Sequence, residues 1–171
     1  MSSTQIFLSI TIGSGPVGGE ASAAGYEDMI ELESFNFGLS AKHALRQNAN
    51  NTRPQLNYDA VKISKVYDVS SVRLATHMGA RARFSKAEIF VDQHLQESAS
   101  VKKQNPVMVI ELKNGFIEDI RLSVSTGKLA STVREDISLS FVNFKIRYYP
   151  SSVVRGKRLP LQEFESRRID T

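Results

Sequence analysis

Hydrophobic and polar residues alternate with a period of two along most of the chain, a pattern typical of β-strands. The first run, from Thr4 to Ile12, places Ile6, Leu8 and Ile10 on one face. The pattern predicts further strands over 28–39, 56–66, 84–94, 107–114, 116–125 and 137–149. In the strand over 84–94 the buried residues are expected to be Ala87, Ile89 and Val91. Seven or eight strands indicate an all-β domain.

Two of these runs change phase part-way along. The run over 28–39 begins with Ile30 and Leu32 on one face and continues with Phe35, Phe37 and Leu39. The run over 137–149 changes in the same way, from Ile137, Leu139 and Phe141 to Phe144, Ile146 and Tyr148. A shift by one residue turns the following side chains to the other face. The changes favour long strands that serve two packed sheets of an antiparallel β-barrel.

One short helix is predicted after Asp68, whose side chain is suited to cap the helix N-terminus. Helical spacing places Val69, Val72, Ala75 and Met78 on one stripe, and Gly79 is expected to end the helix.

The remaining segments are less regular. We expect one barrel domain over 1–171, with an extended loop at about 40–57 and an irregular basic tail at about 151–171. Asn114-Gly115 fits either a tight hairpin turn or a bulge within one longer strand.

Composition excludes several kinds of protein. The chain has 171 residues, 41% of them hydrophobic and none of them cysteine, so disulfides and cysteine-based metal or redox sites are excluded. Apolar runs are too short for a transmembrane helix. The first twelve residues lack the features of a signal peptide, so export without a cleaved signal is expected.

Charge is segregated along the chain, although the net charge is only +4. Residues 1–41 carry −5, residues 42–150 carry +7 and residues 151–171 carry +2. A mild net charge argues weakly for nucleic-acid binding. Blocks of opposite sign favour head-to-tail self-association instead.

Candidate catalytic motifs are weak. Gly13–Gly18 has the G-x-G-x-x-G spacing, but no helix of sufficient length follows, so a loop between strands is expected. His43, His77 and His94 lack metal-ligand spacing. Glu31 and Glu33 lie about 6.6 Å apart on one strand face. That spacing suits acid–base chemistry in a cleft, and a solvated strand face or a charged interface explains it equally well.

The C-terminal tail carries a second cluster of charges that could bind phosphate. Acidic residues are interleaved with these cations, and docking of the tail on a neighbouring subunit is preferred. The cluster comprises Arg155, Lys157, Arg158, Arg167 and Arg168.

Taken in order from residue 4 to residue 150, these segments resemble the Hcp family, the haemolysin-coregulated proteins that form the inner tube of type VI secretion systems. The family often has Trp-x-Trp where this chain has Phe35-Asn36-Phe37, and a glycine-rich loop where this chain is rich in asparagine. The matching stretches are Ile6–Ile10, Ile30–Ser40, Ile63–Ser71, Gly79 with Phe84, Ser123–Gly127 and Ile137–Tyr148.

The resemblance implies homohexameric rings that stack head to tail into a tube. A sheath would expel the tube, with spike and baseplate proteins as further partners and small effectors inside the lumen. Asn36 lies where the family presents a lumen-facing residue. The protein would be cytoplasmic before assembly and then secreted. The candidates for inter-subunit or ring-stacking contacts are Lys42, Arg46, Arg53, Arg155, Lys157 and Arg158.

The tube hypothesis requires no catalytic residue, metal or cofactor, and neither nucleic-acid binding nor membrane insertion. A phage-type tail tube protein would share the implied architecture and is the nearest competing hypothesis. Two more distant hypotheses are a monomeric barrel that binds a ligand or nucleic acid, and an enzyme built around Glu31 and Glu33.

Overall fold

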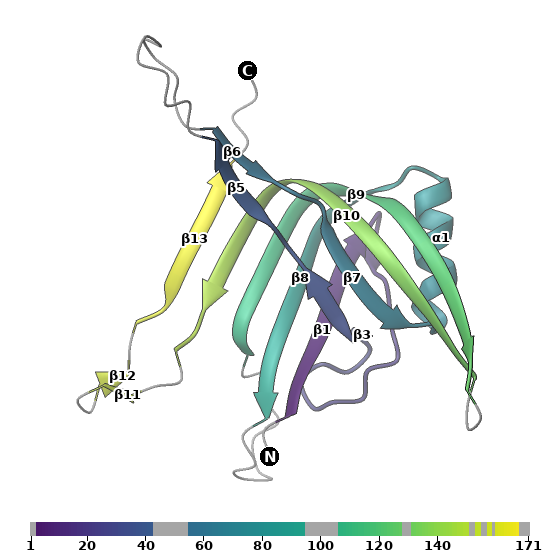
Figure 1. The fold of residues 1–171 in the computed structure, drawn as a ribbon, viewed down its shortest axis with the longest axis horizontal. Coiled ribbons are helices and arrows are strands. Elements are labelled where there is room, and N and C mark those ends of the chain that lie inside the picture. The colour runs from purple at the N-terminus through teal and green to yellow at the C-terminus, as the bar shows by residue number, and fades with distance from the viewer. Residues whose placement is uncertain are drawn as a thin grey trace.

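The structure is a computed structural model that describes residues 3–42, 55–94, 106–127, 131–150, 153–154, 157–158 and 160–167. It consists of β-strands and a single helix in these residues (Figure 1). The elements are β1 (Ser3–Ile12), β2 (Gly15–Pro16), β3 (Ile30–Leu32), β4 (Ser34–Asn36), β5 (Leu39–Lys42), β6 (Gln55–Tyr58), β7 (Val61–Val66), α1 (Val69–Gly79), β8 (Arg83–His94), β9 (Pro106–Thr126), β10 (Ser131–Tyr148), β11 (Val153–Val154), β12 (Lys157–Arg158) and β13 (Gln162–Arg167).

The main sheet is antiparallel, in the order β2-β1-β8-β9-β10-β7-β4. Its path returns to β1, because β3 pairs with β1 while β4 pairs with β7. Only Glu33 separates β3 from β4, and its N–H donates to the Ser64 carbonyl oxygen at 2.8 Å. The change of partner at Glu33 is the physical reason for the predicted phase change, and the all-β barrel architecture is confirmed.

The second predicted phase change, in β10, is also confirmed. Phe141 and Phe144 are both buried in the main core although they are three residues apart. The first half of β10 pairs with β7 and the second half with β13. The two phenylalanines pack with Phe37 and Tyr58, and the Tyr58 and Phe141 rings stack at a centroid distance of 5.1 Å. This aromatic cluster packs where β10 changes its pairing partner from β7 to β13.

A second, smaller core lies on the other face of β1 and β8. Phe7 stacks on Tyr26 at a ring-centroid distance of 4.3 Å, and Phe90 meets the edge of Tyr26. Tyr26 belongs to the segment between β2 and β3, so this segment covers part of the sheet. The alternation in β1 predicted only the face that carries Leu8 and Ile10.

Helix α1 begins and ends where the sequence predicts, but of the apolar stripe only Met78 packs against the core. The Asp68 side chain accepts a hydrogen bond from the Ser70 N–H, and the Ser71 side chain accepts one from the Asp68 N–H. Ser70, Ser71 and Leu74 face the sheet, whereas Val69 and Val72 are exposed. Ser71 also accepts a hydrogen bond from the buried Lys65 and donates one to the buried Glu135, so its side chain points toward the sheet.

Four further predictions about segments need correction. The predicted strand over 56–66 is two strands, β6 and β7, separated at Asp59 and Ala60. The tail is not irregular throughout, because β13 pairs with β10 over six residues. The tail therefore adds an edge strand to the main sheet.

The other two corrections concern β9 and β8. Asn114-Gly115 lies inside the continuous strand β9, so the hairpin interpretation is wrong, and Asn114 adopts a φ of 55°. Val91 is only half-buried whereas Asp92 is buried, because the β8–β9 register shifts between these two residues.

Candidate functional site

Asn36 is exposed on the outer side of β4 and belongs to a row of polar residues that crosses four strands. Asn36 pairs with Lys62 of β7, Lys62 with Ser138 of β10, and Ser138 with Asp119 of β9. Directly paired residues project from the same face of an antiparallel sheet. The four side chains therefore share one surface.

A parallel row lies beside the first. Ser34, Ser64, Asp136 and Arg121 are successive cross-strand partners on the same four strands. The Ser64 hydroxyl donates to the Asp136 carboxylate. We call these two rows the Asn36 surface.

The Asn36 surface carries two cations, Lys62 and Arg121, and two acids, Asp119 and Asp136. Arg121 Nε lies 2.8 Å from the Asp119 carboxylate, and both side chains are well exposed. Exposed pairs of this kind contribute little to stability. They do give the surface a hydrated, charge-balanced character.

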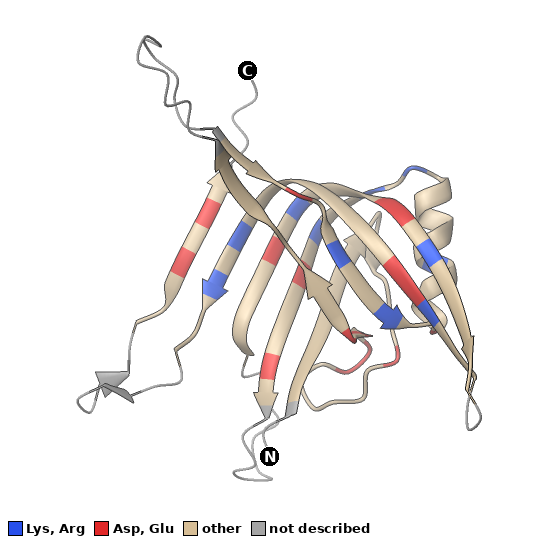
Figure 2. Cartoon of the chain, in the orientation of Figure 1, with Lys and Arg blue, Asp and Glu red and all other residues tan. Residues whose placement is uncertain are grey.

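A second polar surface spans β8, β9 and the second half of β10 (Figure 2). Its centre is Glu111, whose carboxylate lies 3.0 Å from both Lys113 Nζ and Arg147 Nη2. Burial favours the protonated form of Glu111, but the hydrogen bond and charge of Lys113, with the charges of Lys86 and Arg147, outweigh it and lower the pKa. We call Lys86, Glu111, Lys113 and Arg147 the ion-pair ladder.

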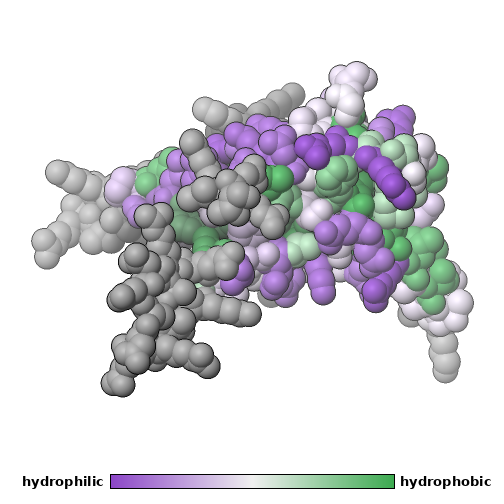
Figure 3. All heavy atoms as spheres, turned by 90° about the horizontal axis from the view of Figure 1, so that it is seen from above, coloured by the Kyte–Doolittle hydropathy of each residue, from purple (hydrophilic) through white to green (hydrophobic). Residues whose placement is uncertain are grey.

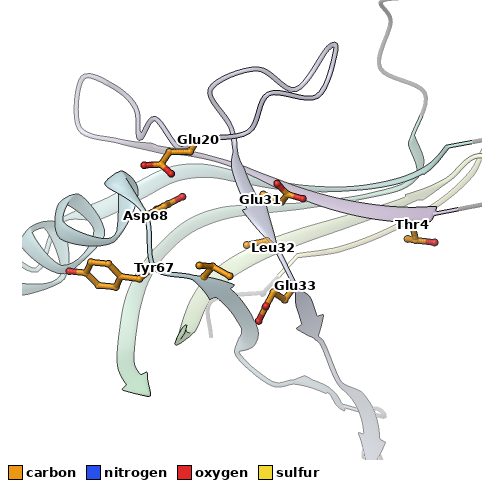
Figure 4. Close-up of a pocket in the computed structure, with 8 residues that line it drawn as sticks. Thr4, Glu20, Glu31, Leu32, Glu33, Tyr67 and Asp68 are labelled. Atoms are coloured by element: carbon orange, nitrogen blue, oxygen red, sulfur yellow. The ribbon is translucent and has the colours of Figure 1, made fainter. Parts of the chain in front are cut away.

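An acidic cleft of about 630 Å³ opens between β3, the end of β7 and the start of α1 (Figure 4). Glu31 and Glu33, which the strand pattern indicates as a carboxylate pair, line this cleft together with Glu20 and Asp68. The remaining lining residues are Thr4, Leu32, Val66 and Tyr67.

The carboxylates of the cleft are engaged differently from a catalytic pair. Glu33 lies 3.0 Å from Arg134 Nε, and Glu20 accepts a hydrogen bond from the Val69 N–H at 3.3 Å. Asp68 caps α1. The arrangement therefore contributes to the helix start and to the contact of Glu33 with β10, and Glu31 and Glu33 both lie on an exposed strand face.

Behind the cleft lies a fully buried lysine that sequence analysis did not find. Lys65 Nζ lies 2.7 Å from the Asp68 carboxylate, 2.8 Å from Glu135 and 3.0 Å from Ser71 Oγ. Burial would raise the pKa of Asp68, but hydrogen bonds from Lys65 and Ser70, with the Lys65 charge, outweigh it and hold the pKa below its ordinary value. The period-two spacing of Lys65 with Val61 and Ile63 was the available signal.

The structure places the other sequence-predicted residues apart from these surfaces or does not describe them. Lys42 ends β5, and Lys157 and Arg158 form β12. Arg46, Arg53, Arg155 and Arg168 lie outside the described residues. Arg167 ends β13. The structure thus does not test the candidate contacts at these cations.

The remaining motifs carry no site. Gly13 and Ser14 form the turn of the β1–β2 hairpin, with Gly13 at a φ of 65°. His77 lies in the last turn of α1, His94 ends β8 and His43 is not described. Among the described residues, no three His, Asp or Glu side chains are grouped to hold a metal ion, and no helix is long and apolar enough to cross a membrane.

The sequence profile of the family described as "Type VI secretion system effector, Hcp" matches residues 7–148. This chain belongs to the Hcp family. The expected family resemblance is confirmed, and a comparison with curated protein sequences finds no match.

Solved structures share the Hcp fold over nearly the whole chain. A type six secretion system protein superposes with a TM-score of 0.73 at 16% identity, covering 94% of this chain and 92% of that one. Hcp1 from Salmonella typhimurium gives 0.64 at 19% identity, with 95% and 94% covered. The anti-feeding prophage baseplate gives 0.52 at 9% identity, with 84% and 93% covered. At these identities the likeness concerns the fold.

Membership of the Hcp family identifies the chain as a secreted tube protein of type VI secretion that assembles with itself, and not as an enzyme. The Hcp chain therefore needs surfaces that contact other copies of the same chain.

Proposed function

We propose that the Hcp chain forms hexameric rings that stack head to tail, and that the Asn36 surface lines the lumen. The observation that carries the proposal is the amphipathic wall formed by β4, β7, β10 and β9. One face of this wall packs on the barrel core, and the other presents serine, asparagine and self-paired charges. A hydrated and charge-balanced surface suits the wall of a water-filled lumen.

The ion-pair ladder is then assigned to the outside of the tube. It lies on β8, β9 and the second half of β10, where β10 pairs with β13 instead of β7. A sheath that expels the tube would meet this outer side, and small effectors would meet Asn36. The protein would be cytoplasmic until the tube is assembled and expelled.

Electron microscopy of the purified protein tests the ring. Rings with a central lumen are expected, and a monomer at every protein concentration would contradict the proposal. The lumen assignment has a separate test, because the chain has no cysteine and a single introduced thiol can be labelled selectively.

We compare Asn36→Cys with Lys86→Cys, which lies on the ion-pair ladder. In assembled tubes, a polymer-linked maleimide too large to enter the lumen should label position 86 and leave position 36 unlabelled. In dissociated subunits both positions should react. Equal labelling of both positions in tubes would overturn the lumen assignment.

The phage-type tail tube remains the second candidate, since the prophage baseplate protein shares the fold. The two functions need the same ring and differ in the machinery that the ring joins. Co-purification of the tube with type VI sheath or spike proteins from the source cell separates them.

A further inference from the structure

The β9–β10 hairpin projects beyond the barrel, and its strands end there without cover. Residues 121–127 are all exposed, so side chains on both faces of β9 are accessible to solvent (Figure 1). Leu122 and Val124 are 60% and 66% exposed, the highest values among the large exposed hydrophobic residues described. Figure 3 shows hydrophobic atoms at the surface of this end of the molecule.

The two side chains continue the barrel core outward. Ile120 packs against the main core, and Leu122 and Val124 follow it on the same face of the strand. Core-type residues on an accessible strand indicate a surface that another molecule covers.

The same part of β9 has an unpaired edge. β8 pairs with β9 only up to Phe116, and from Ile117 to Thr126 the partner of β9 in the described structure is β10 alone. A long unpaired edge that carries exposed apolar side chains such as Leu122 and Val124 is a template for pairing with another chain.

The opposite edge of the same four-stranded wall is β4, where the order of the sheet ends. Arg121 of β9 and Ser34 of β4 lie at the same level, since Arg121 pairs with Asp136, Asp136 with Ser64 and Ser64 with Ser34. The two free edges therefore face away from each other at matching heights.

The charges at these two edges are complementary. Arg121 is an exposed cation at the β9 edge, where it also pairs with Asp119 of its own chain. Glu31 is an exposed carboxylate beside the β4 edge, and Glu33 there pairs with Arg134. Unlike edges at opposite ends of one wall produce a heterologous contact, and such contacts close into rings when the rotation per subunit permits.

We propose that the projecting hairpin of one copy docks beside β3 and β4 of a second copy. Leu122 and Val124 become buried on the barrel side, and Arg121 approaches Glu31 and Glu33 of the neighbour. This contact rests on the proposed ring function and identifies the surfaces that join its subunits. In this contact the Asn36 surfaces of neighbouring copies become continuous, and Leu122 and Val124 are no longer exposed.

The double variant Leu122→Asp, Val124→Asp tests the apolar part of the contact. Both side chains are exposed in the single chain, so the variant should fold with an unchanged circular-dichroism spectrum and melting temperature. The protein concentration at which rings dissociate, measured by light scattering, should rise at least about 100-fold, since two hydrophobic burials are replaced by charges. Leu161→Asp, at another exposed leucine, is the matched control and should leave the rings intact.

A charge exchange tests the identity of the partner surface. Arg121→Glu should weaken the rings, and adding Glu31→Arg should restore them. Arg73→Glu, at an exposed cation of α1, should have no such effect. Rings of unchanged stability in the Asp double variant would overturn the proposed contact, and failure of the exchange to restore rings would overturn the choice of β3 and β4 as partner.

The wild-type protein distinguishes a failure of the proposed function from a failure of the hairpin contact. If the wild type forms no rings at any concentration, the proposed function fails. If the wild type forms rings and the Asp double variant forms them equally well, the function stands and the hairpin contact is wrong.

Discussion

Lys65 Nζ lies 2.8 Å from Oε1 of Glu135, with both side chains almost completely excluded from solvent. The two residues come from β7 and β10, and their pairing continues to Asp68 at the start of α1. Three elements thus meet at one ammonium group, and Glu135 of β10 is 70 residues from Lys65 in sequence. The contact holds α1 against the wall that carries the Asn36 surface.

Replacing Lys65 with Met should strongly destabilise the fold. The variant leaves the Glu135 carboxylate buried without its cation, and loss of one partner of a buried pair costs about 3–5 kcal/mol. The free energy of unfolding, measured by urea denaturation, should fall by that amount. Lys145→Met is the control, because Lys145 pairs with Glu163 and Glu165 in partly exposed contacts, whose loss should change the free energy of unfolding far less.

The double variant Lys65→Met, Glu135→Leu distinguishes the unpaired charge from other causes. It removes both ionic groups, so it should recover part of the stability that Lys65→Met loses. No recovery, or a Lys65→Met variant as stable as the wild type, would show that the Lys65–Glu135 pair does not hold the fold.

Acid should weaken the helix start through Asp68. Hydrogen bonds and the Lys65 charge hold the folded-state pKa of Asp68 below its ordinary value of 3.8, despite the opposing effect of burial. A lowered pKa contributes stability that is complete above the ordinary value and is lost as the pH falls through the folded-state value. The wild type should therefore lose stability as the pH falls below about 4, through this group among others.

The variant Asp68→Asn isolates this contribution. Asparagine retains the capping function and removes the charge. The variant should melt at a lower temperature than the wild type at pH 7, and the difference should shrink at pH 3. A difference in melting temperature that is the same at both pH values would contradict the assignment to Asp68.

Sequence alone predicted most of the strand-forming segments and both phase changes, although not every strand boundary, because alternation with a period of two records which face meets the core. Glu33 marks the first change, and the pair Phe141 and Phe144 marks the second. The pattern also indicated Glu31 and Glu33 as exposed neighbours. It could not indicate that Glu20 and Asp68 join them, since this depends on how distant segments pack.

The errors share a cause. Lys65 and Ser71 are polar residues on inward faces, and their burial depends on partners supplied by β10 and the helix cap. Helical periodicity likewise places Val69 and Val72 on an apolar stripe, although both are exposed. A hydrophobic pattern cannot separate a residue that faces the core of its own chain from one that faces a neighbouring chain. For the same reason, the exposure of Leu122 and Val124 could not be predicted from the pattern.

Gly115 should tolerate no side chain. A Cβ at position 115 would collide with the Ser140 carbonyl oxygen and the Phe84 ring, both of which are held in the barrel. Gly115→Ala should lower the free energy of unfolding by about 1–3 kcal/mol. Gly79→Ala is the matched control, because a Cβ there meets no neighbouring atom and alanine favours helix.

The two glycine variants should move the urea midpoint in different directions. Gly115→Ala should lower it, and Gly79→Ala should leave it unchanged or raise it slightly. A Gly115→Ala variant as stable as the wild type would show that β9 does not approach β10 and Phe84 closely at this position.

Salt should dissolve stacks of rings before it dissolves the rings themselves. Residues 1–41 carry five acids and no Lys or Arg, and the later residues carry a net positive charge, so a stacking contact between these two parts of the chain would be electrostatic. Ions screen such contacts over about 8 Å at physiological ionic strength and about 3 Å at 1 M. Burial of Leu122 and Val124 between subunits is not screened in this way. Electron microscopy across a salt series should therefore show tubes, then single rings, and stacks that persist unchanged at high salt would contradict an electrostatic stacking contact.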